Sequence, residues 1–212
     1  MPRPKILKET RREAEERAPP SMEDIKPHDW LSDESADLYL RTAAFSAPFD
    51  LYLSWIAKEK IMDHALKEAP KRLEVMGFLL GEVFTWKGKQ YALVRDVVTT
   101  HLKSSSAKVR FDPDAFPRLF SKLDDSGFDY ILVGWYHSHP GHTCFLSRTD
   151  LETQRTMFSQ EYHCAVVIDP LNRDIKAFKL EGDGYCEVPF AVLGQDAQRV
   201  RKTRKLKAKL AV

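Results

Sequence analysis

The sequence predicts an α/β fold in which one domain is built around a central sheet. The first indication is that strand-like and helix-like segments alternate over about 140 of the 212 residues, with no internal repeat. The second is the segment 130–136, YILVGWY, which is apolar almost throughout, as is typical of a strand buried on both faces. Together the two patterns favour helices packed against a sheet within a single domain.

Residues 1–48 are predicted to form a charged arm or linker ahead of a globular domain at 49–190. Within this arm, residues 5–18 are expected to form an exposed helix that ends at the following Pro-Pro pair. Residues 33–40 are expected to form a second short helix. The last segment, 191–212, is predicted to be a basic tail.

The globular domain begins with a strand and an amphipathic helix. Ser54 is suited to cap the helix that follows strand 51–53, because Ala57, Ile61 and Ala65 recur at the spacing of one helical face. The remaining elements are expected in the order strand 74–84, strand 91–100, polar loop 101–110, helix 116–123, strand 130–136, helix 148–158, and strands 164–168, 175–180 and 185–190. The first two of these strands are predicted to pair as a hairpin.

Charge is unevenly distributed along the chain, although 33 Lys+Arg and 31 Asp+Glu sum to only +2. Residues 199–212 hold seven basic and no acidic side chains, so the rest of the chain carries 2 − 7 = −5. No run of 18 apolar residues occurs, and the charged N-terminus lacks the apolar core of a secretory signal. We therefore expect a cytoplasmic protein without membrane segments, whose body has no nucleic-acid-binding character. The basic tail is expected to be solvated, or to dock on an acidic partner or nucleic acid.

The motif with the clearest chemistry lies at 134–150, GWYHSHPGHTCFLSRTD. His137 and His139 are two positions apart where the buried strand ends, and this spacing directs both imidazoles to one side of an extended chain. Asp150 follows in the first turn of the next helix, where its carboxylate can turn back toward the histidines. Two histidines and a carboxylate are a common zinc-ligand set in hydrolases, and they leave a fourth position for water.

The same residues also have purely structural interpretations. Ser147 and Asp150 have the spacing of a helix capping box, and the two histidines can be satisfied polar groups where a strand leaves the core. Glu74 opens an otherwise apolar strand, which suits either a general base beside a metal or a solvated strand end. The full pattern, His-x-His, seven residues, then Ser-x-x-Asp, is rare by chance and favours the metal site.

Several motifs together resemble one known family. They are EVMG at 74–77, LG at 80–81, GWYHSHPG at 134–141, Cys144, LS at 146–147, Asp150 and AVVIDP at 165–170. This set is similar to the motif of the JAMM (MPN+) zinc metalloproteases, most of all to the proteasome-lid deubiquitinase and its signalosome relative, over roughly residues 50–189. The scarcity of asparagine, with Asn172 the only one, favours a thermophilic source and an archaeal-type homologue.

The resemblance implies a cytidine-deaminase-like three-layer α/β/α sandwich with a central mixed β-sheet, and it makes the globular domain the catalytic one. It also implies Zn²⁺-dependent cleavage of isopeptide bonds at the C-terminus of ubiquitin or a ubiquitin-like protein, in connection with the proteasome. By motif position, His137, His139 and Asp150 would hold one catalytic Zn²⁺. Glu74 would act as general base and then acid, and Ser147 would help to stabilise the oxyanion.

Other interpretations stay open at this stage. A related enzyme would process a ubiquitin-like sulfur carrier, and a non-catalytic MPN scaffold would only assemble a complex, although such scaffolds lack parts of the ligand set that is complete here. The loop 101–110 matches the family segment to which the substrate's extended tail adds as a strand. His142 is a candidate for direct contact with metal or substrate, whereas Cys144 is interpreted as a packed thiol and not a nucleophile.

Overall fold

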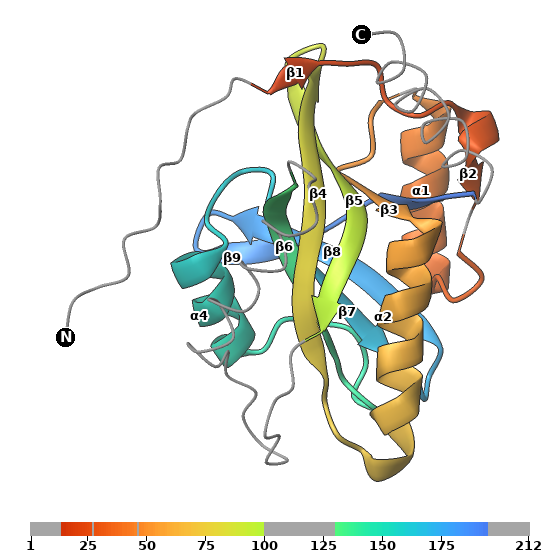
Figure 1. Cartoon of the computed structure of the whole chain (residues 1–212), viewed down its shortest axis with the longest axis vertical. Helices are drawn as coiled ribbons and strands as arrows, with labels where there is room; N and C mark the ends of the chain where they lie inside the picture. Colours follow the sequence, from red (N-terminus) through yellow and green to blue (C-terminus); the bar gives the residue numbers. More distant parts are fainter. Residues whose placement is uncertain (1–13, 27, 46, 100–129, 195–212) are drawn as a thin grey trace, which may run out of the picture.

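In the computed structural model, residues 14–26, 28–45, 47–99 and 130–194 are described, and their strands form one ten-stranded sheet. The strand order is β2-β10-β3-β5-β4-β6-β7-β8-β9, with β1 attached to β4 (Figure 1). The strands are β1 (Glu15–Glu16), β2 (Ile25–Lys26), β3 (Leu51–Ser54), β4 (Met76–Trp86), β5 (Lys89–Thr99), β6 (Ile131–Ser138), β7 (Cys164–Asp169), β8 (Asp174–Glu181), β9 (Gly184–Val188) and β10 (Phe190–Leu193). The helices are α1 (Asp33–Ala44), α2 (Trp55–Glu68) and α4 (Arg148–Met157), with short 3-10 turns η1 (Met22–Asp24) and η2 (Ala69–Lys71).

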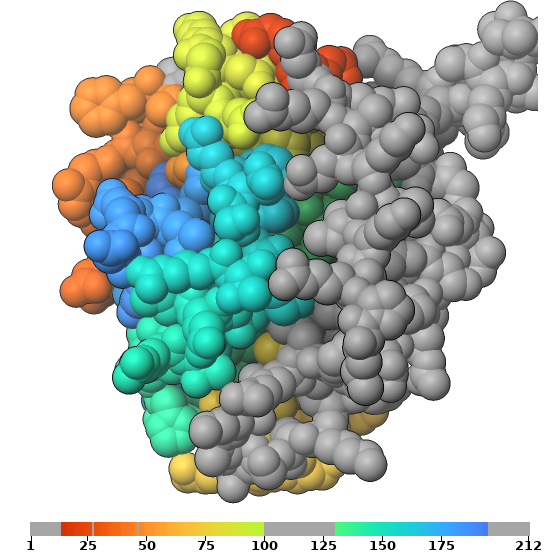
Figure 2. All heavy atoms as spheres, turned by 90° about the vertical axis from the view of Figure 1, so that its left-hand side faces the viewer, coloured from red at the N-terminus to blue at the C-terminus, as the bar shows by residue number. Residues whose placement is uncertain are grey.

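Helices cover both faces of this sheet. On β7, Val166 lies in one buried cluster with Ile61 of α2, whereas the next residue, Val167, lies in another with Phe158, which follows α4. Because successive side chains of a strand point to opposite faces, α2 and α4 lie on opposite sides of the sheet. Figure 2 shows the α4 side, where α4 lies beside strands β8 and β9. Parallel and antiparallel pairs both occur, so the predicted α/β fold with a mixed central sheet is confirmed.

The first strand and helix of the globular domain form as predicted. Ser54 caps α2, since its hydroxyl oxygen accepts a hydrogen bond from the Ala57 amide at 3.1 Å. The buried face of the helix consists of Ala57, Ile61, Met62 and Ala65. Burial of a side chain the size of Ile or Met stabilises a fold by about 1.5 to 3 kcal/mol, so this face anchors α2 to the sheet.

The predicted hairpin is also confirmed, because β4 and β5 pair antiparallel through a turn at Lys87 and Gly88. The buried strand β6 lies between β4 and β7. Its Gly134 leaves no room for a side chain, since a Cβ atom there would lie 2.0 Å from the carbonyl oxygen of Cys164. This close approach lets parallel pairing with β7 begin at Gly134, shortly before His137.

The N-terminal arm differs from the prediction. Residues 15–16, predicted as helix, form β1, which pairs in parallel with Phe84 and Thr85 of β4. In the described residues, β4 pairs with β6 only as far as Gly81. The backbone N–H and C=O groups on this edge of β4 beyond Gly81 can therefore pair with β1. The Arg17 guanidinium adds a contact 4.7 Å from the centre of the Phe84 ring. Figure 2 shows β1 (red) against the β4–β5 turn (yellow), so part of the arm belongs to the sheet.

The end of the domain differs as well, because the predicted strand 185–190 is two strands. β9 pairs with β8, whereas β10 lies parallel to β3 near the other end of the sheet order. Pro189 separates them, and a proline cannot donate the amide hydrogen bond that would continue a ladder. The sheet therefore extends to Leu193, past the predicted boundary at 190.

Other predictions fall partly or wholly outside the described residues. The expected short helix at 33–40 is confirmed as α1, which runs on to Ala44. The polar loop 101–110, the helix 116–123 and the basic run 199–212 lie outside the described residues. In the part of the chain that the structure describes, no helix is long and apolar enough to cross a membrane.

Two buried histidines make the fold sensitive to acid. Burial lowers the pKa of both His28 and His163 to about 4. In His163, Nδ1 accepts a hydrogen bond from the Gln160 amide at 3.1 Å, and Nε2 lies 3.2 Å from the Leu132 carbonyl oxygen. This arrangement suits a neutral ring that donates from Nε2 and has no proton on Nδ1.

We therefore expect the free energy of unfolding to fall as the pH drops from about 6.5 to about 4. In that window the unfolded chain takes up a proton that folded His163 does not, which lowers stability by up to about 3 kcal/mol. Urea unfolding of the wild type and of His163→Gln, from about pH 7.5 down to about 4.5, isolates the effect. The advantage of the wild type should shrink as pH falls, and a constant difference would contradict the prediction.

Candidate metal centre

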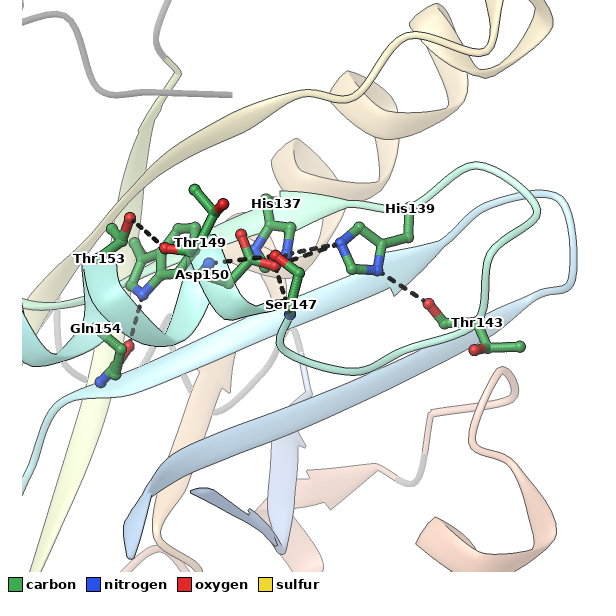
Figure 3. A network of polar contacts seen from close by, with 9 residues as sticks. His137, His139, Thr143, Ser147, Thr149, Asp150, Thr153 and Gln154 are labelled. Atoms are coloured by element: carbon green, nitrogen blue, oxygen red, sulfur yellow. Dashed lines mark hydrogen bonds and ion pairs between the residues drawn. The ribbon is translucent and has the colours of Figure 1, made fainter. Parts of the chain in front are cut away.

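Three ligand atoms converge where β6 ends and α4 begins (Figure 3). The Nε2 atoms of His137 and His139 lie 3.1 Å apart. Oδ2 of Asp150 lies 3.5 Å from the first and 3.8 Å from the second. Both imidazoles are buried, and the Asp150 side chain is only 13% exposed. The sequence-predicted set is thus brought together in space as one compact group of donors.

These separations fit a tetrahedral zinc ion. Donor atoms at the usual distance of about 2.0 to 2.2 Å from zinc lie about 3.3 to 3.6 Å from one another in a tetrahedron. The observed separations of 3.1, 3.5 and 3.8 Å centre on that range. Two imidazoles and one carboxylate leave a position for water or substrate, as in catalytic zinc sites and unlike closed structural ones.

The sheet positions the first histidine and only partly positions the second. His137 is held within β6, opposite Met76 of β4 and Val167 of β7. His139 follows the strand, where its amide donates to the Ile168 carbonyl at 2.9 Å. The two imidazoles point to one place, as their spacing predicts for an extended chain.

Ser147 and Asp150 form a true capping box at the start of α4. The Asp150 amide donates to Ser147 Oγ at 3.2 Å, and the Ser147 amide donates to Asp150 Oδ2 at 2.8 Å. This Oδ2 atom is also the one that faces the histidines. Ser147 and Asp150 can therefore cap the helix and serve a metal site at the same time, because the cap orients the Asp150 carboxylate toward the imidazoles.

Charge within the group suits metal binding. Burial opposes ionisation of Asp150, but the contacts with His137 and His139 outweigh it and hold the pKa of the carboxyl below its ordinary value. Burial lowers the pKa of His137. Burial has the same tendency at His139, where Asp150, Glu74 and the Thr143 carbonyl outweigh it and raise the pKa. An ionised carboxylate beside a buried neutral imidazole is the form in which such ligands bind Zn²⁺.

Glu74 stands just before β4, beside the histidine end of β6. The next residue, Val75, is held against β6 by two hydrogen bonds. The Val75 amide donates to Ser138 Oγ at 3.0 Å, and the Ser138 amide donates to the Val75 carbonyl at 2.9 Å. Glu74 is half-buried, and its negative charge is a smaller influence that raises the pKa of both His137 and His139. It does not belong to the three-residue ligand group, so its carboxylate is available for another role.

A buried amide connects α4 to the strand that carries the first histidine. Gln154 is fully buried, and its Oε1 accepts a hydrogen bond from Trp135 Nε1 at 2.6 Å. The indole of Trp135 stacks on His137, with ring centres 4.5 Å apart and planes at 12°. Because Gln154 lies one turn beyond Asp150, this bond sets the register of the helix against β6.

Replacing Gln154 with Leu should therefore reduce both stability and zinc affinity. Removing a buried hydrogen-bond partner costs about 1 to 3 kcal/mol of unfolding free energy, and the Trp135 indole loses its acceptor. Thr153→Ala, on the same helix, is the matched control. Urea unfolding and chelator competition measure the two effects, and a variant as stable as the control would refute the assigned role.

The match to a family of known proteins agrees with this geometry. The family model described as JAB1/Mov34/MPN/PAD-1 ubiquitin protease matches residues 51–161, more than half of the chain. The chain belongs to the JAB1/Mov34/MPN/PAD-1 family. The matched range includes Glu74, His137, His139, Ser147 and Asp150.

Several relatives in this JAB/MPN family are subunits of large complexes. The chain is 38% identical over 124 residues to the 26S proteasome non-ATPase regulatory subunit 14 of Dictyostelium discoideum, and 36% identical over 124 residues to the ubiquitin carboxyl-terminal hydrolase RPN11 of Saccharomyces cerevisiae. Each match covers 57% of this chain and 39% of the relative. It is 32% identical over 144 residues to COP9 signalosome complex subunit 5 of Debaryomyces hansenii, covering 63% of this chain and 29% of that one. The chain thus spans less than half the length of these relatives.

A solved structure supports the fold alone. The solution structure of protein DSY2949 from Desulfitobacterium hafniense superposes with a TM-score of 0.51 at 21% identity. It covers 68% of this chain and 94% of that protein. The shared architecture is the α/β fold, which in this JAB/MPN chain holds the candidate metal ligands.

Three supporting residues were not singled out by sequence reasoning. Gln154 has no signal in the sequence, because a glutamine in a helix is ordinary. Thr143 contacts His139 through its carbonyl oxygen, and Asp169 accepts a hydrogen bond from the Thr143 amide. Asp169 is an acid at the end of an otherwise apolar strand, which is the same kind of sequence feature that drew attention to Glu74.

Cys144 and His142, two further residues of the JAB/MPN motif, differ in their exposure to solvent. Cys144 is buried, and burial raises the pKa of its thiol, which agrees with its interpretation as a packed side chain and not a nucleophile. His142 is exposed and lies outside the three-residue ligand group, so its contact with metal or substrate stays a prediction.

Proposed function

We propose that the chain is a zinc-dependent isopeptidase that cleaves the bond between the C-terminus of ubiquitin, or a ubiquitin-like modifier, and a substrate lysine. The observation that carries the proposal is the convergence of His137, His139 and Asp150 inside a JAB/MPN domain. Glu74 lies near enough for its charge to act on the pKa of both histidines. The names of the relatives support ubiquitin as the substrate class and the proteasome as the setting.

The metal would be held by His137 Nε2, His139 Nε2 and Asp150 Oδ2. When bound, Zn²⁺ supplies Lewis acidity, which polarises a carbonyl and lowers the pKa of bound water to about 7. The chain's own contribution is to hold two imidazoles and one carboxylate in place before the ion arrives. A side-chain nucleophile is not needed for this chemistry.

Glu74 would serve as general base and then as general acid. Its carboxylate would take a proton from the attacking water and give it to the departing lysine amine, so that the proton count balances over the cycle. The position just before β4 suits this role, because the hydrogen bonds between Val75 and Ser138 fix the backbone beside the histidines.

Ser147 would stabilise the negative charge that develops on the scissile carbonyl oxygen. In the capping box its Oγ accepts from the Asp150 amide, and a hydroxyl that accepts in this way can still donate its own proton. Loss of one such donor costs about 3 to 4 kcal/mol of transition-state stabilisation in other hydrolases.

Removal of the metal should abolish cleavage reversibly. Treatment of the purified chain with phenanthroline is expected to stop hydrolysis of diubiquitin, or of a ubiquitin-like fusion from the same source, and added Zn²⁺ should restore it. A sulfur-carrier fusion assayed in parallel identifies the alternative substrate class. Cleavage that persists in the metal-free protein would refute the mechanism, whereas binding without cleavage in the zinc-loaded protein would favour a scaffold.

A further inference from the structure

The second histidine of the metal centre depends on a part of the chain that the proposed mechanism does not use. His137 lies within β6 and stacks on Trp135, and its Nδ1 has no hydrogen-bond partner among the described residues. His139 lies beyond the end of β6, and its Nδ1 lies 3.1 Å from the Thr143 carbonyl oxygen. The direction of the His139 ring is therefore set by the conformation of the loop that follows it.

This loop is held by one carboxylate. Oδ1 of Asp169 accepts hydrogen bonds from the amides of Gly141 at 2.8 Å, Leu171 at 3.1 Å and Asn172 at 3.1 Å. Its Oδ2 accepts from the Thr143 amide at 2.8 Å and from Asn172 Nδ2 at 2.7 Å. Asp169 has no exposed surface, so these five donors replace the water that a buried carboxylate would otherwise need.

The backbone conformation of the loop explains why such an anchor is needed. Gly141 has a φ of 84° and Thr143 a φ of 63°, in the left-handed region that a threonine rarely adopts. The Asp169 carboxylate binds the amides of these same two residues. It therefore stabilises the conformation in which the Thr143 carbonyl oxygen faces His139.

We propose that Asp169 is a positioning residue, which acts through the Thr143 backbone to keep His139 Nε2 directed at the metal centre. The chain of contacts is Asp169 Oδ2, Thr143 amide, Thr143 carbonyl and His139 Nδ1. β7 also holds the backbone of His139 through the Ile168 carbonyl, one residue before Asp169. The end of β7 thus sets both the place and the orientation of this ligand. The proposal rests on the proposed function only in that His139 binds zinc.

The test compares Asp169→Asn with Asn172→Ala in the full chain. Asparagine keeps the size of the side chain, but one acceptor oxygen becomes an NH₂ donor, so at least the donors on that side lose their acceptor. Asn172→Ala is the matched control, because it removes one donor from the same carboxylate and leaves the bonds to Gly141 and Thr143 in place.

We expect Asp169→Asn to weaken Zn²⁺ binding by about 10- to 100-fold, the range found for outer-shell partners of metal ligands. The control should change the Kd by less than about 3-fold, and competition with a chromophoric chelator measures both. In the zinc-free protein, hydrogen exchange at the Gly141 and Thr143 amides should be faster in Asp169→Asn, while the amides of β7 keep their protection. A wild-type Kd, or equal losses in the two variants, would overturn the proposal.

If Asp169→Asn does not fold, nitrogen NMR of the zinc-free wild-type protein at alkaline pH tests the contact between Thr143 and His139 through which Asp169 would act. The proposal requires the neutral His139 ring to carry its proton on Nδ1, bonded to Thr143. A proton on Nε2, or rapid exchange between the two tautomers, would overturn it. A wild type that binds Zn²⁺ but cleaves no conjugate would count against the proposed function and leave this inference standing.

Discussion

Replacing Glu74 with Gln should reduce isopeptide cleavage by about 100- to 10,000-fold, the usual contribution of a general acid–base residue. The amide has nearly the same shape as the carboxylate but cannot take a proton from water at neutral pH. Because Glu74 lies outside the three-residue ligand group, we expect the affinity for Zn²⁺ to stay close to that of the wild type. The measurement is kcat/KM on diubiquitin together with the zinc Kd.

Glu152→Gln is the matched control for this prediction. Glu152 is an exposed acid on α4, and its neutralisation changes the net charge by the same amount. The control should keep full activity. If Glu74→Gln cleaved as fast as the control, another group would have to transfer the proton, and the assignment of Glu74 would be wrong.

Replacing Asp150 with Asn is expected to have the largest effect on the metal itself. The change removes the anionic ligand that lies 3.5 and 3.8 Å from the two Nε2 atoms. The loss of zinc affinity should exceed the roughly 100-fold upper range of an outer-shell change, and cleavage should disappear with the metal. Chelator competition gives the Kd, and the same cleavage assay gives the activity.

The fold should survive this substitution, which makes the result interpretable. The asparagine oxygen can still accept from the Ser147 amide, so the cap of α4 is kept. Asp183→Asn, at an exposed position in the turn between β8 and β9, controls for the change of charge. An Asp150→Asn protein with normal zinc affinity would show that this carboxylate is not a ligand.

The order of the expected losses is itself informative. Asp150 is one of the three proposed ligands, whereas Asp169 would act on the site only through Thr143 and His139. The zinc affinity should therefore fall more for Asp150→Asn than for Asp169→Asn, and least for Asn172→Ala. The reverse order would mean that the loop, and not the ligand set, dominates the binding energy.

Much of the fold was predictable from the sequence because its signals are local. The apolar face of α2, the cap at Ser54 and the buried strand β6 depend on residues close together in the chain. The convergence of His137 and His139 was predictable for the same reason, since two positions along a strand share one side. The capping box at Ser147 and Asp150 is also local, and it directs the carboxylate oxygen that faces the two histidines.

The rest was decided by tertiary structure, because it depends on pairing between distant segments. β1 lies on β4 where β6 no longer covers it, and β10 lies beside β3, and no local pattern encodes either choice. The support of His139 by Asp169 depends mainly on backbone amides, which every residue type except proline has, so the sequence does not identify the donors. The sequence by itself thus determined the candidate ligand set and the helix and strand that carry it. Only the packed sheet determined which buried groups hold them in place, because a buried carboxylate must find its donors wherever the fold presents them.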